Sequence, residues 1–207
     1  MSDDVSVTPL ELLRTPPPKE RADAARNRSA ILDAATRLFA EHGIDEVSMD
    51  QVAAAAGVGK GTLFRRFGDK AGLAAALLDE RERALQEAVL HGPPPLGPGA
   101  PDAERLTAFA GAYLDYVLRH LPLVRMSETA TPGARYRIGA YRFWHRHVAI
   151  LLRGAPDPEH AAHALLAPLA AEHLTAVLPE LGERRVRAGI DRLWRQVIAD
   201  NGVCPSP

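Results

Sequence analysis

Apolar residues recur at three- and four-residue spacing along most of the chain, which is the period of an amphipathic helix. In the first such stretch, Ile31, Ala35, Leu38 and Phe39 fall on one helical face. A longer stretch with the same spacing runs from about residue 69 to 90. The sequence has no run of alternating polar and β-branched residues, so we expect an all-α fold.

A segment rich in proline and glycine, residues 91–101, interrupts this pattern. After it, the apolar spacing predicts a helical body. The expected helices cover about 102–120, a short segment at 123–130, 134–153, 158–178 with a kink at Pro168, and 183–201.

Residues 48–67 contain two short helical stretches separated by a turn at Gly57 and Val58. Ser48, followed three residues later by Gln51, has the form of a capping box and marks the start of the first stretch. Glycine at position 57 suits the left-handed backbone that ends many helices. Two helices joined in this way form a helix-turn-helix, in which the second helix can enter the major groove of DNA.

The second stretch divides its side chains between an apolar side and a cationic side. We expect Leu63, Phe64 and Phe67 to supply the apolar side. The side chains expected to be exposed are Lys60, Thr62, Arg65 and Arg66. This division suits a DNA surface, because cations neutralise phosphates while short polar groups reach base edges.

Several motifs at fixed spacing make this part of the chain similar to a known family. They are Ala56-Gly57-Val58, Gly61-Thr62-Leu63-Phe64, Phe67 and Lys70, with Ile31 to Gly43 upstream. Over about residues 26–78 the chain resembles the DNA-binding domain of the tetracycline-repressor (TetR) family of bacterial transcriptional regulators. The resemblance implies an N-terminal three-helix helix-turn-helix domain that binds a palindromic operator in double-stranded DNA. The candidate DNA-binding residues are Arg28, Ser48, Lys60, Gly61, Thr62, Phe64, Arg65, Arg66 and Lys70. Arg28 belongs to a basic stretch that either contacts the phosphate backbone or minor groove or is a solvated arm, and both interpretations stay open.

Two positions depart from the family's usual pattern. Phe64 stands where the family usually has tyrosine, so a hydrogen bond from a phenol to a phosphate is missing. Gly59 stands where serine often caps the helix, and glycine is a weaker cap by a few tenths of a kcal/mol. We expect DNA binding to survive both changes, with an operator preference that need not follow the family.

The expected organisation has three parts: a disordered N-terminal tail at 1–20, the helix-turn-helix DNA-binding domain at 21–68, and a helical regulatory and dimerisation domain at 69–207. The resemblance implies a homodimer built by a four-helix bundle from the last two long helices, here about 158–178 and 183–201. A dimer also suits DNA reading, because paired half-sites lie about one helical turn apart, roughly 34–36 Å. The alternative is that these apolar faces only close the core of the monomer.

Composition narrows the class of protein. The net charge of −1 gives no global basic field, whereas residues 60–70 carry a local charge of +3 from Lys60, Arg65, Arg66 and Lys70 against Asp69. The one cysteine, Cys204, excludes an internal disulfide. We see neither a signal peptide nor an apolar run of membrane-spanning length, so we expect a cytoplasmic protein with no membrane partner.

The resemblance further implies a small-molecule effector site in the body, of unknown ligand identity. Candidate lining residues are Phe109, Tyr113, Tyr116, Arg125, Met126, Tyr141, Trp144 and His145. An aromatic box with one arginine would suit a planar or anionic effector. Aromatic residues at helical spacing are also ordinary core residues, so the core interpretation stays open at each position.

Enzyme, metal and cofactor motifs are not evident in the sequence. His145 and His147 lie two positions apart and point to different faces of a helix, while His160 and His163 lack a third metal ligand. We expect no metal, no cofactor and no enzymatic activity. The leading hypothesis is a homodimeric repressor that releases its operator on binding a small molecule. One alternative is a DNA-binding regulator without such an effector, controlled by a protein partner. Another is an enzyme that carries a similar helix-turn-helix domain at its N-terminus.

Overall fold

The computed structural model describes residues 19–200, and residues 1–18 and 201–207 lie outside the described part. Regular structure within residues 19–200 is entirely helical, as the apolar spacing predicts. The elements are α2 (Lys19–His42), α3 (Met49–Ala55), α4 (Lys60–Phe67), α5 (Lys70–His91), α6 (Asp102–Arg119), α7 (Leu121–Glu128), α8 (Ala134–Arg137), α9 (Gly139–Leu151), α10 (Pro158–Leu166), the 3₁₀ helix η1 (Ala167–Leu169) and α11 (Ala171–Asp200).

The chain divides into two compact units, Met1–Arg66 and Phe67–Pro207. We call them the N-terminal unit and the C-terminal unit, and describe each by itself. The division falls two residues before the boundary expected from the sequence. Of the tail expected at 1–20, residues 1–18 lie outside the described part, and Lys19 and Glu20 belong to α2 rather than to a tail.

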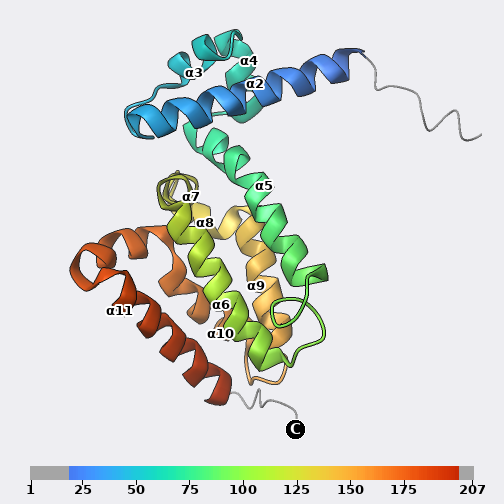
Figure 1. The fold of residues 1–207 in the computed structure, drawn as a ribbon, viewed down its shortest axis with the longest axis vertical. Coiled ribbons are helices and arrows are strands. Elements are labelled where there is room, and N and C mark those ends of the chain that lie inside the picture. The colour runs from blue at the N-terminus through green and yellow to red at the C-terminus, as the bar shows by residue number, and fades with distance from the viewer. Residues whose placement is uncertain (1–18, 201–207) are drawn as a thin grey trace, which may run out of the picture. The chain divides into compact units, whose positions relative to one another are not determined.

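The N-terminal unit is the three-helix arrangement α2–α3–α4 (Figure 1). Ile31 on α2, Val52 on α3 and Leu63 on α4 are each at most 1% exposed and form its core. Gly43 ends α2 with φ +81°, and its amide donates to the Phe39 carbonyl at 3.0 Å. Each of the three helices therefore contributes buried apolar side chains to the unit.

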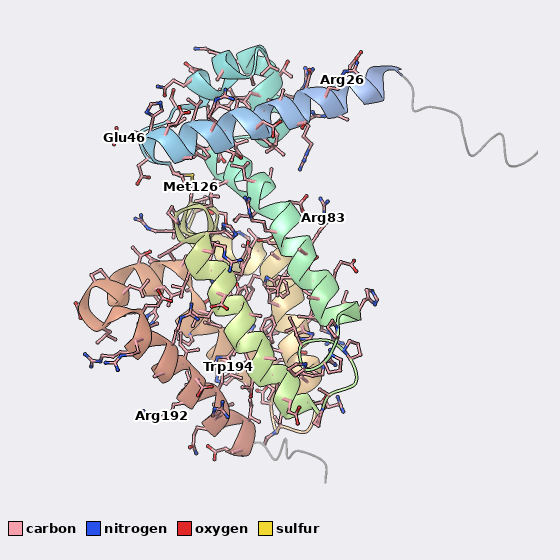
Figure 2. The ribbon with its side chains drawn as sticks, in the orientation of Figure 1. Arg26, Glu46, Arg83, Met126, Arg192 and Trp194 are labelled. Atoms are coloured by element: carbon pink, nitrogen blue, oxygen red, sulfur yellow. The ribbon has the colours of Figure 1, made fainter. Side chains whose placement is uncertain are left out.

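In the C-terminal unit, α6 packs against α11, α9, α5 and α7, while α10 packs on α9 (Figure 1). Its core contains Phe109, Trp144, Leu165 and Trp194, each at most 1% exposed. In Figure 2, Trp194 extends from α11 toward this core, while Arg192 extends to the outside. Contacts between α6, α9, α10 and α11 make this a single apolar core. The expected boundaries of α5 and α6 are confirmed to within about a residue.

The segment expected as one helix at 134–153 is two helices. α8 ends at Arg137, Ile138 is extended with ψ 142°, and α9 begins at Gly139. The break turns the chain so that Arg135 can be buried against other helices. The expectation of one helix was wrong because the packing of Arg135 against distant helices causes the break, and such packing leaves little signal in the local sequence.

Pro168 has a larger effect than the expected kink. α10 ends at Leu166, η1 follows, and Ala170 is extended with ψ 135° before α11 begins. The two long helices are bent by 50° at this break. Proline lacks an amide and clashes with the carbonyl four residues earlier, which explains why the helix stops.

The second expected break, between 178 and 183, is a single residue. α11 keeps helical geometry past Pro179 and leaves it only at Gly182, with φ 72° and ψ 153°. Helix then continues to Asp200. Between residues 19 and 200, no single helix is both long and apolar enough to cross a membrane. One bent pair of helices, Pro158–Leu169 with Ala171–Asp200, has the required length and hydropathy when the two are taken together.

Candidate nucleic-acid interface

α3 begins with a reciprocal cap. The Gln51 amide donates to Ser48 Oγ at 3.2 Å, and the Ser48 amide donates to Gln51 Oε1 at 2.7 Å. These bonds satisfy amides that lack partners within the helix, so the expected capping box is confirmed. Ser48, a candidate DNA contact, therefore already fixes the start of α3.

The turn between α3 and α4 depends on one glycine. Gly57 has φ +65°, which side chains with a Cβ rarely adopt. The Gly57 amide donates to the Ala54 carbonyl at 3.2 Å, and the Val58 amide donates to the Ala53 carbonyl at 3.0 Å. Val58 is half-buried beside this turn. The turn thus ends α3 cleanly and starts α4 two residues later.

α4 has one buried and one exposed side. Leu63 is fully buried and Phe67 is half-buried. The residues that share the exposed side are Lys60, Gly61, Phe64 and Arg65. At about 100° per residue these four positions fall within one arc of about 140° around the helix axis. We call this set the exposed face of α4.

One side was assigned wrongly from the sequence. Phe64, expected on the apolar side, is 44% exposed, while Thr62 is half-buried. Leu63 and Phe67 lie four positions apart and form the buried stripe by themselves. Phe64 lies about 100° around the helix axis from Leu63, within the exposed face of α4.

The cations of α4 differ in their contacts. Lys60 Nζ forms an ion pair with the Asp50 carboxylate, and Arg66 donates to the carbonyl of Ala24 on α2. Arg65 has no hydrogen-bond or ion-pair partner among the residues whose side chains are described. Because Lys60 and Asp50 are both more than half exposed, their pair contributes little stability and can give way to a phosphate.

Asp50 was not among the predicted residues. The only signal in the sequence is an acidic residue in the first turn of one helix and a cation in the first turn of the next. Nothing in that spacing shows that the two side chains meet.

Arg28 and Lys70 are half-buried, and each has contacts of its own. Arg28 lies on α2 in the N-terminal unit, whereas Lys70 is the first residue of α5 in the C-terminal unit. Next to Lys70, Asp69 Oδ1 accepts a hydrogen bond from the Gly72 amide at 2.8 Å and caps α5. Only Arg28 of this pair therefore lies in the same compact unit as the exposed face of α4.

The candidate effector residues fall into two groups in the C-terminal unit. In the first group, Tyr113 stacks on Phe109 at 5.5 Å and also lies 5.5 Å from the Trp144 ring. Tyr116 stacks on Tyr113 at 6.0 Å and donates its hydroxyl proton to Glu82 Oε1 at 2.9 Å. Burial raises the pKa of both Tyr113 and Tyr116. These four aromatic residues fill the core with one another.

The second group lies where α9 meets α10. The Tyr141 hydroxyl shares a hydrogen bond of 2.7 Å with His163 Nδ1, and the His145 ring lies 3.9 Å from the His163 ring. Burial raises the pKa of Tyr141 to about 12. Of the remaining candidates, Arg125 is exposed and Met126 is half-buried on α7. The candidates therefore do not form one aromatic box.

Buried polar residues were missed altogether. Arg135 forms a buried ion pair with Glu128 and also donates to the Leu166 carbonyl at 3.0 Å. The Ala171 amide donates to Glu128 Oε2 at 2.9 Å, which ties α7 and α8 to the start of α11. Burial raises the pKa of Glu128 although Arg135 opposes the change. Two arginines in a four-residue helix give no sequence signal that one of them is buried in such a role.

This helix-turn-helix resembles known DNA-binding proteins in sequence. The family model described as "Bacterial regulatory proteins, tetR family" matches residues 31–77, which cover α3, α4 and the adjoining parts of α2 and α5. An HTH-type transcriptional regulator of Staphylococcus aureus strain USA300 is 45% identical over 53 residues. That alignment covers 26% of this chain and only 29% of the relative, so it concerns a part of each protein.

Solved structures share the fold over most of the chain. A TetR-family transcriptional regulator of Pectobacterium atrosepticum is 25% identical with a TM-score of 0.63, covering 90% of this chain and 99% of that one. NalD, the secondary repressor of the MexAB-OprM multidrug efflux pump in Pseudomonas aeruginosa, is 20% identical with a TM-score of 0.54, covering 85% and 96%. The likeness to NalD shows the fold alone. Together with the helix-turn-helix geometry, these matches support a TetR-family regulator, and the family model itself matches residues 31–77.

Proposed function

We propose that the protein is a transcriptional regulator that binds a palindromic operator as a homodimer and reads it with α4. The observation that carries the proposal is the exposed face of α4, where Lys60 and Arg65 flank Gly61 and Phe64 on a helix-turn-helix. Cations on such a face neutralise phosphates, and residues between them can reach base edges. The net charge of −1 restricts this attraction to the local patch.

Selection of bound fragments from genomic DNA of the source organism, followed by measurement of affinity against salt, tests the proposal. For Lys60→Ala and Arg65→Ala we expect weaker binding. The slope of log K against log salt should shrink by about 0.9 for every phosphate that the variant no longer neutralises. Arg142→Ala, at an exposed arginine of α9, is the matched control and should change neither value.

Arg66→Ala separates two roles of arginine on the same helix. Arg66 is tied to the Ala24 carbonyl, so we expect its removal to change the salt slope less than the removal of Arg65. A selection that yields no preferred sequence, or a double variant Lys60→Ala/Arg65→Ala that binds like the wild type, would contradict the assignment of α4.

We further propose that the output is repression and that a small molecule in the C-terminal unit relieves it. Phe109, Tyr113, Tyr116 and Trp144 pack on one another, so a ligand between them must displace aromatic contacts. Binding is then linked to a change of conformation, and the ligand must favour that conformation by a few kcal/mol to empty the operator.

Tryptophan fluorescence is a direct readout, because Trp144 and Trp194, the two tryptophans of the chain, both lie in this core. A metabolite that changes this fluorescence, raises the melting temperature and dissociates the operator complex would support an effector. If a broad metabolite set does none of these, control by a protein partner becomes the better hypothesis.

A further inference from the structure

Phe64 is an aromatic side chain exposed on a helix that is otherwise well packed. It is 44% exposed, while its neighbour Leu63 is fully buried. The contrast between adjacent residues shows that α4 itself is held in place and that the exposure of Phe64 follows from its side of the helix. Exposed phenyl surface is unfavourable in water, so a partner that covers it gains free energy.

The surroundings of Phe64 define what that partner presents. Lys60 lies one helical turn before Phe64 and Arg65 directly follows it, so cations lie on both sides of the ring. Gly61 lies beside it on the same face, and a Cβ added there would meet no atom within 4 Å. The ring thus has open space next to it and lies between two groups that attract phosphates.

The chemistry of the ring selects one group in the major groove. A phenyl ring has neither a donor nor an acceptor, so it gains nothing from phosphate oxygens or from the polar base edges. Thymine is the base that offers an apolar group in the major groove, its C5-methyl. We propose that Phe64 packs on the C5-methyl group of one thymine in each half-site and is a specificity-determining residue. This inference rests on the proposed function of α4 as the reading helix.

Removal of single methyl groups from the DNA tests the inference. In the selected operator, each thymine is replaced in turn by deoxyuridine, which keeps every hydrogen-bonding group and lacks only the methyl. We expect one position in each half-site to lose about fourfold in affinity, the effect of exposing one buried methyl-sized group. In Phe64→Ala the same replacement should have no effect, while the salt slope stays as in the wild type.

Leu90→Ala is the matched control, because Leu90 on α5 is also 44% exposed and should leave the thymine effect intact. Lys60→Ala should lower the salt slope and still distinguish thymine from deoxyuridine. Specific binding without any methyl-sensitive thymine, or equal sensitivity in Phe64→Ala, would overturn the inference and leave the proposed function standing. Absence of any preferred sequence would overturn both.

Discussion

His147 is buried without a partner for one of its ring nitrogens. The residue is 8% exposed, and its Nε2 atom has no hydrogen bond among the described residues. The Phe109 ring lies 5.1 Å away. Burial and, secondarily, the charge of Arg105 lower the pKa of His147 to about 4. The imidazole is therefore neutral in the folded protein at pH 7.

This position should make stability depend on pH. The folded pKa of about 4 lies below the ordinary value of 6.5, so the unfolded chain binds a proton first as pH falls. The contribution of neutral His147 to the free energy of unfolding is fully present above pH 6.5 and is lost as pH falls toward 4. Between pH 7 and pH 5 we expect the free energy of unfolding to decrease by about 2 kcal/mol through this residue.

Urea unfolding at both pH values, at one protein concentration, measures the effect. His147→Gln should lose that part of the pH dependence, whatever its absolute stability. His160→Gln, at an exposed histidine of α10, is the control and should keep it. A His147→Gln variant with the pH dependence of the wild type would refute the argument.

Side-chain contacts of this kind were not readable from the sequence. The motif located α4 correctly, yet Leu63, Phe64 and Phe67 permit more than one buried stripe on an eight-residue helix. Packing within the N-terminal unit selects the stripe of Leu63 and Phe67. The same unit ties Arg66 to α2, which is a contact across 42 positions of the chain.

α4 carries a glycine where alanine would make a more stable helix. Gly61 lies in the first turn, is exposed, and has open space at its Cβ position. Glycine in a helix interior costs up to about 1 kcal/mol relative to alanine. Close approach of the backbone to DNA would explain why this cost is tolerated.

Gly61→Ala should therefore raise stability by about 0.5–1 kcal/mol and weaken operator binding. Gly111→Ala is the matched control, since Gly111 on α6 is also an exposed helical glycine with no atom within 4 Å of an added Cβ. It should raise stability and leave DNA binding unchanged. Thermal unfolding and operator titration measure the two effects, and undiminished binding by Gly61→Ala would rule out close backbone approach.

Helix ends were predictable where a local residue sets them. Gly43 and Pro168 stop helices for reasons that lie in their own backbone geometry. The break at Ile138 has no comparable cause, because it serves the buried contact of Arg135 with Glu128. Removing one partner from such a pair leaves an unpaired buried charge, so the pair constrains how α7, α8 and α11 can pack.

The folds of the two units were predictable from different kinds of sequence information. The N-terminal unit carries a dense local motif, and the family model matches residues 31–77, which lie largely within it. The C-terminal unit shares its fold with relatives at only 20–25% identity. Its helices were predictable from periodicity, whereas its ring contacts depend on how those helices pack.

The proposed dimer would cover apolar side chains that α11 leaves at the surface. Leu193 is 41% exposed at the edge of the stripe formed by the buried Val186, Ile190 and Trp194, whereas Leu181, 38% exposed, precedes the kink at Gly182. Two copies of such a face could pair about a twofold axis and bring two α4 helices to one palindrome.

Leu193→Arg should then shift the protein from dimer to monomer, because a twofold contact places the new charge against or near its own copy. Ile150→Arg is the control, since Ile150 on α9 is 49% exposed and lies outside the proposed pairing helices. Sedimentation at micromolar concentration gives the oligomeric state, and circular dichroism shows that both variants keep their helices. If Leu193→Arg stays dimeric, or Ile150→Arg also dissociates, the pairing face must lie elsewhere. In the expected outcome, Leu193→Arg loses most of its affinity for the full palindrome and keeps its weak affinity for a single half-site.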